Sequence, residues 1–243
     1  MITSKQNELI KKIRSLHDKK YRDLNKLYLV EGSKMVNEAV SLGQKTECVI
    51  CTERARSLVP DLKDVCQLVT EEVFRSVTTE VSPQGVLAVL KKPENPLVSP
   101  SDSCLFLDGV TDPANVGAII RTAAAAGYKQ LYLSNCADAY SPKAVRASMS
   151  GIFNVKIYNG NSDELLQVIN KPIIIADMGG ENVFDTVIEN PFCLVIGSEA
   201  HGVSEKLREK ATVSVSIPMQ SGMESLNAGV SAGILMYALK NKF

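Results

Sequence analysis

The sequence predicts an α/β protein in which a small α/β module precedes a larger part with a mostly parallel sheet. After about residue 100, short apolar runs alternate with helical stretches, a pattern that indicates parallel strands covered by helices on both faces. Three prolines within residues 93–100 exclude regular structure there and indicate a linker. The chain has 243 residues, enough for two domains, and we expect these to be residues 1–97 and 98–243.

The amino-terminal module is predicted from a helix-cap signal and short β-like runs. Thr70 precedes Glu71 and Glu72, which is the order of an N-cap and the acids that the helix dipole favours in a first turn. We expect further helices at about 5–16 and 33–42, and strands at about 48–52, 67–69 and 85–90.

The carboxyl-terminal part reads as six strands separated by helices. The strands are expected at 104–107, 130–134, 155–158, 173–176, 193–196 and 213–217, and the helices at 116–126, 143–149, 163–169, 204–210 and about 226–240. Ligands of such sheets bind beyond the carboxyl ends of the strands, so the loops at those ends are the first candidates for a site.

Charge is unevenly distributed along the chain. Lys and Arg balance Asp and Glu at 27 each, yet residues 1–30 hold eight bases and three acids. Such asymmetry is typical of a basic arm that binds nucleic acid, and equally of a solvated amphipathic helix.

Several function classes are excluded by composition. Apolar runs are too short to span a bilayer, and the first residues lack the apolar stretch of a signal peptide, so we expect a soluble, cytoplasmic protein without membrane contact. Cys48 and Cys51 match C-x-x-C but fall in a β-like run, where they point to opposite faces. With His17 and His201 as the only histidines, no metal site is expected.

Residues 229–233 match G-x-S-x-G, the pattern of a hydrolase nucleophile. That pattern needs a sharp strand-to-helix turn and a later histidine, whereas here the stretch continues as helix and no His follows. Small residues for close helix packing explain it better.

Polar side chains gather instead in three glycine-containing loops at predicted strand ends. The first loop holds Asn115 and leads to Arg121, the second holds Glu199, and the third holds Ser225 and Asn227. Each residue has a structural alternative: Arg121 could extend to solvent, Asn115 could cap a helix, and Ser225 could be an N-cap. Convergence of the three loops at one sheet edge favours a binding or catalytic site.

These loops resemble motifs 1, 2 and 3 of the SpoU (TrmH) family of SPOUT RNA methyltransferases over about residues 104–243. The motifs read Asp112-Pro113-x-Asn115-x-Gly117-x-x-x-Arg121, Ile196-Gly197-Ser198-Glu199-x-x-Gly202 and Ile217-Pro218-Met219-x₅-Ser225-Leu226-Asn227. The amino-terminal part is similar to the ribosomal-protein-like substrate-binding domain of ribosomal-RNA members, at Tyr28-Leu29-Val30-Glu31-Gly32 and Ser82-Pro83-Gln84-Gly85-Val86.

The resemblance implies methyl transfer from S-adenosylmethionine to a ribose 2′-hydroxyl of RNA, with ribosomal RNA expected first because the amino-terminal module stands where transfer-RNA members have short terminal helices. It also implies a carboxyl-terminal trefoil knot and a homodimer. A transfer-RNA methyltransferase and a non-catalytic RNA-binding or assembly protein are the alternatives. Neither the RNA nor the modified nucleotide follows from the sequence.

The resemblance also assigns residues. Ile196, Gly197, Ile217, Met219 and Leu226 are expected to bind the cofactor, and Asn115, Arg121, Glu199, Ser225 and Asn227 to act in catalysis. A guanidinium is almost always charged, so we expect Arg121 to bind the target phosphate and the developing alkoxide, and to act as a base only if its site removes its proton.

Two positions depart from the family pattern. His201 stands in motif 2 where it is less usual, and we interpret it as a loop side chain. Gly229 replaces the common Ser or Ala after motif 3, and Gly in a first helical turn costs up to about 1 kcal/mol relative to Ala.

Overall fold

The computed structural model describes residues 1–62, 65–222 and 225–240. These residues form two compact units. The amino-terminal unit combines Met1–Pro93 with Asp138–Phe153, and the carboxyl-terminal unit combines Glu94–Ala137 with the chain from Asn154 onward. The amino-terminal unit therefore takes up a segment that lies well beyond residue 97 in the sequence.

The amino-terminal unit is built on a four-stranded sheet in the order β1 (Leu27–Glu31), β4 (Val86–Lys91), β2 (Thr46–Thr52) and β3 (Gln67–Val69). Strand β4 is antiparallel to both neighbours, whereas β3 is parallel to β2. Apolar side chains of α1 (Glu8–Ser15) and α4 (Glu71–Arg75) pack with the strands in one buried cluster. Thr70 accepts a 3.3 Å hydrogen bond from the Val73 amide, which confirms the predicted N-cap.

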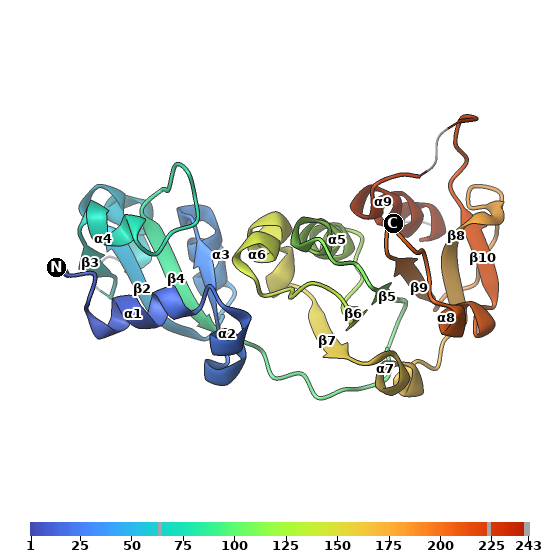
Figure 1. The fold of residues 1–243 in the computed structure, drawn as a ribbon, viewed down its shortest axis with the longest axis horizontal. Helices are drawn as coiled ribbons and strands as arrows, with labels where there is room; N and C mark the ends of the chain where they lie inside the picture. Colours follow the sequence, from blue (N-terminus) through green and yellow to red (C-terminus); the bar gives the residue numbers. More distant parts are fainter. Residues whose placement is uncertain (63–64, 223–224, 241–243) are drawn as a thin grey trace. The chain divides into compact units, whose positions relative to one another are not determined.

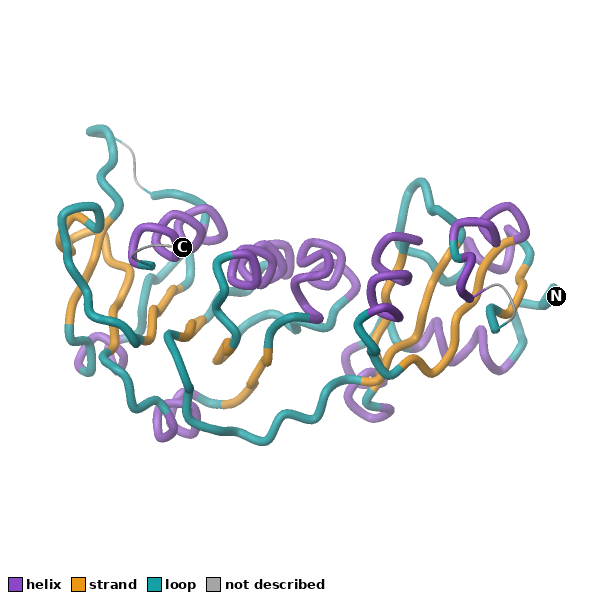
Figure 2. Tube along the Cα trace, turned by 180° about the vertical axis from the view of Figure 1, so that it is seen from behind, coloured by secondary structure: helices purple, strands orange, loops and turns teal. Residues whose placement is uncertain are grey.

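Other helices of this unit are α2 (Lys19–Asn25), α3 (Ser33–Ser41) and α6 (Pro142–Ser148), with 3₁₀ turns at Glu53–Leu58, Pro60–Leu62 and Met149–Phe153. Figures 1 and 2 show helices on either side of the β1–β4 sheet.

Residues 1–30 fold into the amino-terminal unit, and their binding to nucleic acid stays a prediction. Residues 1–30 form α1, α2 and most of β1, and Ile10, Ile13 and Leu16 are fully buried because α1 is amphipathic. Most bases of the segment pair with acids of the same unit: Lys5 with Glu72, Lys11 with Glu8, Lys12 with Glu47, Lys19 with Asp23, and Arg22 with Asp138. The excess positive charge is therefore largely compensated where it lies.

The carboxyl-terminal unit contains a six-stranded, entirely parallel sheet. Its order is β10 (Val213–Ser216), β8 (Ile173–Asn182), β9 (Cys193–Gly197), β5 (Cys104–Asp108), β6 (Gln130–Ser134) and β7 (Lys156–Gly160). Helices α5 (Pro113–Ala125) and α9 (Ala228–Leu239) cover one face, and α7 (Ser162–Val168) and α8 (Glu205–Glu209) the other (Figure 1). The predicted α/β class is confirmed, while the trefoil knot stays a prediction.

Strand β8 extends to Asn182, beyond its predicted end at residue 176, and its pairing with β10 is interrupted on the way. Strand β10 pairs with Ile174 and Ile175, then with Glu181 and Asn182, so residues 176–180 leave the ladder. A Cβ on Gly180 would lie 2.6 Å from the backbone of Ser214, which only glycine avoids. This excursion forms part of the edge where the site lies.

Candidate active site

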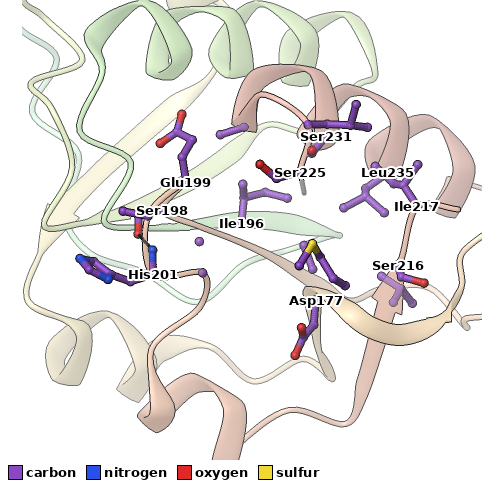
Figure 3. A pocket seen from close by; sticks show the side chains of 18 of the residues that line it. Asp177, Ile196, Ser198, Glu199, His201, Ser216, Ile217, Ser225, Ser231 and Leu235 are labelled. Atoms are coloured by element: carbon purple, nitrogen blue, oxygen red, sulfur yellow. Dashed lines mark hydrogen bonds between the residues drawn. The ribbon is translucent and has the colours of Figure 1, made fainter. Parts of the chain in front are cut away.

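A cavity of about 450 Å³ lies beyond the carboxyl ends of β8, β9 and β10, against α9 (Figure 3). Because the strands are parallel, their carboxyl ends meet at one edge, as expected for ligand sites in such sheets. Seven of the ten predicted site residues line the cavity: Ile196, Gly197, Glu199, Ile217, Met219, Ser225 and Leu226.

The loop after β9 is held in a narrow turn by its glycines. The backbone groups of Ser198 and Gly202 exchange two hydrogen bonds, of 2.9 and 3.1 Å. A Cβ on Gly197 would lie 2.2 Å from the carbonyl carbon of Gly202, so no other residue fits. The two glycines of the G-x-E-x-x-G pattern are therefore steric requirements of this turn, and Glu199 points away from Asp177 (Figure 3).

A buried carboxylate anchors the far end of this loop. Asp108 ends β5, is 7% exposed, and accepts a 2.8 Å hydrogen bond from the Ser204 amide. Since β5 and β9 are paired up to Asp108 and Gly197, this bond fixes the start of α8 against the central strands.

Three predicted catalytic residues form one hydrogen-bonded chain. The amide nitrogen of Asn227 donates a 2.9 Å bond to Oδ1 of Asn115, whose own amide nitrogen donates to Oε1 of Glu199. The three side chains come from motifs 3, 1 and 2, respectively. The structure thus joins all three motifs at the rim of the cavity.

The N-caps of α5 and α9 explain how the side-chain amides of Asn115 and Asn227 can take part in this hydrogen-bonded chain. Asp112 caps α5 by accepting from the Ala114 amide at 3.1 Å, so Asn115 is free to reach Glu199. Asn227, and not Ser225, caps α9: its Oδ1 accepts from the amides of Gly229 and Val230. The alternative interpretation of Ser225 as an N-cap is therefore wrong, and Ser225 lines the cavity instead.

Gly229 has a packing role that the sequence did not reveal. A Cβ there would lie 3.3 Å from the Cβ of Ala118 on α5, tighter than ordinary van der Waals contact. A missing side chain at this position lets α9 approach α5 and brings Asn227 to Asn115.

Arg121 lies apart from the other predicted residues. It is exposed, does not line the cavity, and has no hydrogen bond or ion pair to the described residues. Six residues of α-helix rotate a side chain by about 240°, so Arg121 points away from the side of α5 that carries Asn115.

Residues of the cavity wall that sequence reasoning missed include Asp177, Arg208, Ser231 and Leu235. Asp177 directly follows the predicted strand 173–176, and the rule that found Glu199 could have found it too. Arg208 gave no such signal, because it lies in a short helix rich in charges.

The remaining candidates give no second site. Within the part of the chain that the structure describes, no group of three or more His, Cys, Asp or Glu side chains is placed to hold a metal ion, and no helix is both long and apolar enough to cross a membrane. Cys48 and Cys51 lie in β2 as predicted and, like the other four cysteines, are free thiols.

Comparison with known proteins supports the resemblance over both parts of the chain. The SpoU rRNA Methylase family model matches residues 102–237, and the MRM3-like substrate binding domain model matches residues 7–88. The 23S rRNA (guanosine(2553)-2′-O)-methyltransferase RlmP of Bacillus subtilis is 30% identical over 253 residues, covering 98% of both chains.

Solved structures agree over nearly the full length. The AdoMet-bound rRNA methyltransferase of Sinorhizobium meliloti is 28% identical with a TM-score of 0.86, covering 98% of this chain and 95% of its own. The SpoU methyltransferase AviRb of Streptomyces viridochromogenes, solved in complex with the cofactor AdoMet, is 25% identical with a TM-score of 0.85, covering 96% and 97%. With its three motifs joined at one cavity and a family model matched over more than half its length, the chain belongs to the SpoU rRNA Methylase family.

Proposed function

We propose that this protein transfers a methyl group from S-adenosylmethionine to a ribose 2′-hydroxyl of RNA, with ribosomal RNA as the substrate. The hydrogen-bonded chain Asn227–Asn115–Glu199 at the cavity rim carries the proposal, because it unites the residues of all three motifs. A module that only binds RNA has no need of this set.

The cavity suits the cofactor in size and chemistry. Its 450 Å³ falls within the range of about 300–1,000 Å³ of small-molecule sites. Ile196, Leu226 and Leu235 offer an apolar wall for an adenine ring. Two carboxylates and one guanidinium line the cavity, at Asp177, Glu199 and Arg208, and their net negative charge suits a cation. S-adenosylmethionine, when bound, supplies a methyl group on a positively charged sulfur.

The chain's own residues position the reacting ribose. In-line transfer needs the oxygen at about 3 Å from the methyl carbon, so orientation contributes much of the rate. We assign that orientation to Glu199, held by Asn115, and to the hydroxyl of Ser225, while Ile217, Met219 and the backbone of Gly197 hold the cofactor.

In this proposal, Arg121 takes part in the reaction only if a second copy of the chain is present. Its guanidinium points away from the Asn115 side of α5, and we propose that it binds the target phosphate and the developing alkoxide in the cavity of the partner subunit of a homodimer. Apolar side chains exposed on α9 support such an interface: Val230 is 52% and Tyr237 46% exposed.

The two parts of the chain divide the work in this proposal. Residues 1–97 bind the RNA and residues 98–243 carry out the transfer, in keeping with the two family models matched. The relatives named for ribosomal RNA favour that substrate over transfer RNA. Free thiols at all six cysteines favour the reducing cytoplasm as the location.

Mapping ribose methylation in total RNA from cells with and without the protein tests the substrate. We expect loss of one 2′-O-methyl site in ribosomal RNA; loss in transfer RNA alone would overturn that substrate. Calorimetric titration of the full chain with S-adenosylmethionine tests the activity, because a folded protein that does not bind it is a binding or assembly module.

Coexpression of an Arg121→Ala chain with a Glu199→Ala chain tests the shared site. If Arg121 acts across the interface, each mixed dimer holds one intact site, and about one quarter of wild-type activity returns. If Arg121 acts within its own subunit, the mixture stays as inactive as each variant. Near-wild-type turnover of Arg121→Lys would contradict the need for a planar guanidinium.

A further inference from the structure

Arg208 occupies an unusual place in the cavity wall. Among the described residues that line the cavity, it is the only Lys or Arg. It lies on α8, a five-residue helix that follows the loop after β9. None of the three motifs contains it.

The Arg208 guanidinium ties together two segments that the sheet does not join. Its Nε donates a 2.9 Å hydrogen bond to the carbonyl of Val203, directly after the Gly197–Gly202 turn. Its Nη1 donates to Oδ2 of Asp177, in the excursion of β8. The planar fork of Arg allows one side chain to hold both acceptors at fixed separation.

The backbone cannot make this connection. Pairing between β8 and β9 ends at Ile175 and Val195, two residues before Asp177. Pairing between β8 and β10 is interrupted over the same stretch, because residues 176–180 leave the ladder. The two walls of the cavity therefore separate at the point where Arg208 bridges them.

Asp177 fixes its own segment as well. Its second oxygen, Oδ1, accepts a 3.4 Å hydrogen bond from the Gly179 amide, within the excursion. Asp177 and Arg208 are both partly exposed in the cavity, with 27% and 34% of the side chain accessible. An ion pair in this setting connects two segments at the cavity wall rather than filling a core.

We propose that Asp177 and Arg208 are a positioning pair, which holds the excursion of β8 against the Gly197–Gly202 turn and so sets the width of the cofactor cavity. The cofactor part of this inference rests on the proposed function. Neither residue is assigned to the chemical step.

The bridge itself is tested by amide hydrogen exchange of the full chain, which does not depend on activity. In Arg208→Met and in Asp177→Asn, we expect exchange to become at least about fivefold faster in both 176–180 and 198–203. Lys206→Gln is the matched control: it removes the Lys206–Asp163 ion pair from the same helix and should leave both segments unchanged. Unchanged exchange in the Arg208 and Asp177 variants overturns the proposal.

Cofactor affinity tests the consequence. We expect the Kd for S-adenosylmethionine to rise at least about tenfold in both variants and not in Lys206→Gln, since misplacing a binding wall slightly is costly. The KM for RNA should stay unchanged, and the double variant should bind as the single ones do. Should Arg208→Met fail to fold, Arg208→Lys keeps the charge but cannot span both acceptors, and it should show the same direction. If exchange is altered in the variants but the wild-type chain does not bind S-adenosylmethionine, the bridge is supported and the proposed function is refuted. If the folded variants bind S-adenosylmethionine with wild-type affinity, the effect of the pair on the cavity is refuted.

Discussion

The side-chain amide of Asn227 lies 2.9 Å from that of Asn115, although 112 positions separate the two residues in the sequence. The same Asn227 side chain caps α9 with its oxygen and holds Asn115 with its nitrogen. One residue thus couples the start of a helix to the orientation of Glu199.

Asn227→Asp should separate these two roles. Asp and Asn cap helices about equally well, so we expect the free energy of unfolding to change by less than about 0.5 kcal/mol. The donor to Asn115 is lost, so kcat should fall at least about tenfold, the lower end of what positioning groups contribute. Asn227→Ala should lose stability as well, by about 1 kcal/mol. Denaturant unfolding and turnover assays measure both effects, and wild-type turnover of Asn227→Asp would contradict the coupling.

Gly197→Ala should disrupt the turn after β9. The added methyl would lie 2.2 Å from Gly202, so the turn must open and the protein should lose roughly 1–3 kcal/mol, as for other overpacked sites. Cofactor binding should be lost with it. Gly179→Ala is the control, because a Cβ there has no neighbour within 4 Å. Thermal melting measures the stability of the two variants, and calorimetry measures their cofactor binding. Equal stability and equal binding of Gly197→Ala and Gly179→Ala would refute the steric role of Gly197.

The buried ion pair Arg22–Asp138 should be far more important to stability than an exposed one. Its side chains are 3% and 11% exposed, and Arg22 also donates to the carbonyls of Leu16 and His17. Asp138→Asn leaves a buried charge unpaired and should cost about 3–5 kcal/mol.

The exposed pair Arg54–Glu71 provides the control for that experiment. Its side chains are 61% and 46% accessible, and Arg54→Gln should cost less than about 1 kcal/mol. Urea unfolding followed by circular dichroism measures both, and similar losses would contradict the assignment of a buried pair.

Asp23 should make the stability of the amino-terminal unit depend on acid pH. Burial raises the pKa of its carboxyl, but hydrogen bonds from Lys19 and Lys92 outweigh burial and lower that pKa from 3.8 to about 2. A pKa lower in the folded state means stabilisation that is present above about pH 4 and is lost as the pH falls towards 2.

In Asp23→Asn the melting temperature should accordingly be lower than wild type at pH 6, and the difference should disappear near pH 2. Glu8→Gln, at an exposed ion pair, serves as the control. A difference that persists unchanged at pH 2 would rule out titration of Asp23 as its cause.

Periodicity predicted the carboxyl-terminal fold well because its strands are buried on both faces. Five of the six strands and all five helices were placed within a few residues, whereas β8 runs well past its predicted end, and Thr70 was found as a cap. Strand β1 was noticed only as a motif and α2 was missed, since α2 is short and charged. Charge counting along residues 1–30 did not include the acids, such as Glu72 and Asp138, that folding brings to that segment.

Strand-end reasoning predicted seven residues that line the cavity, because parallel strands converge at one edge. It could not tell that Arg121 faces another direction, since that depends on where α5 begins: the cap at Asp112 sets the phase of the helix. The link between Asp177 and Arg208 depends on an interruption of β8 that apolar patterning does not encode. Residues 223–224 of the motif 3 spacing lie outside the described residues.

The packing of residues 138–153 with the amino-terminal unit limits how the protein can be taken apart. The chain passes between the units after Pro93, Ala137 and Phe153, so no single cut releases either one whole. A chimaera that exchanges residues 1–97 alone would separate Arg22 from Asp138 and Tyr28 from Tyr140, whose rings lie 5.0 Å apart. The amino-terminal unit is therefore not an interchangeable cassette, and a graft from a relative must carry the distant segment with it.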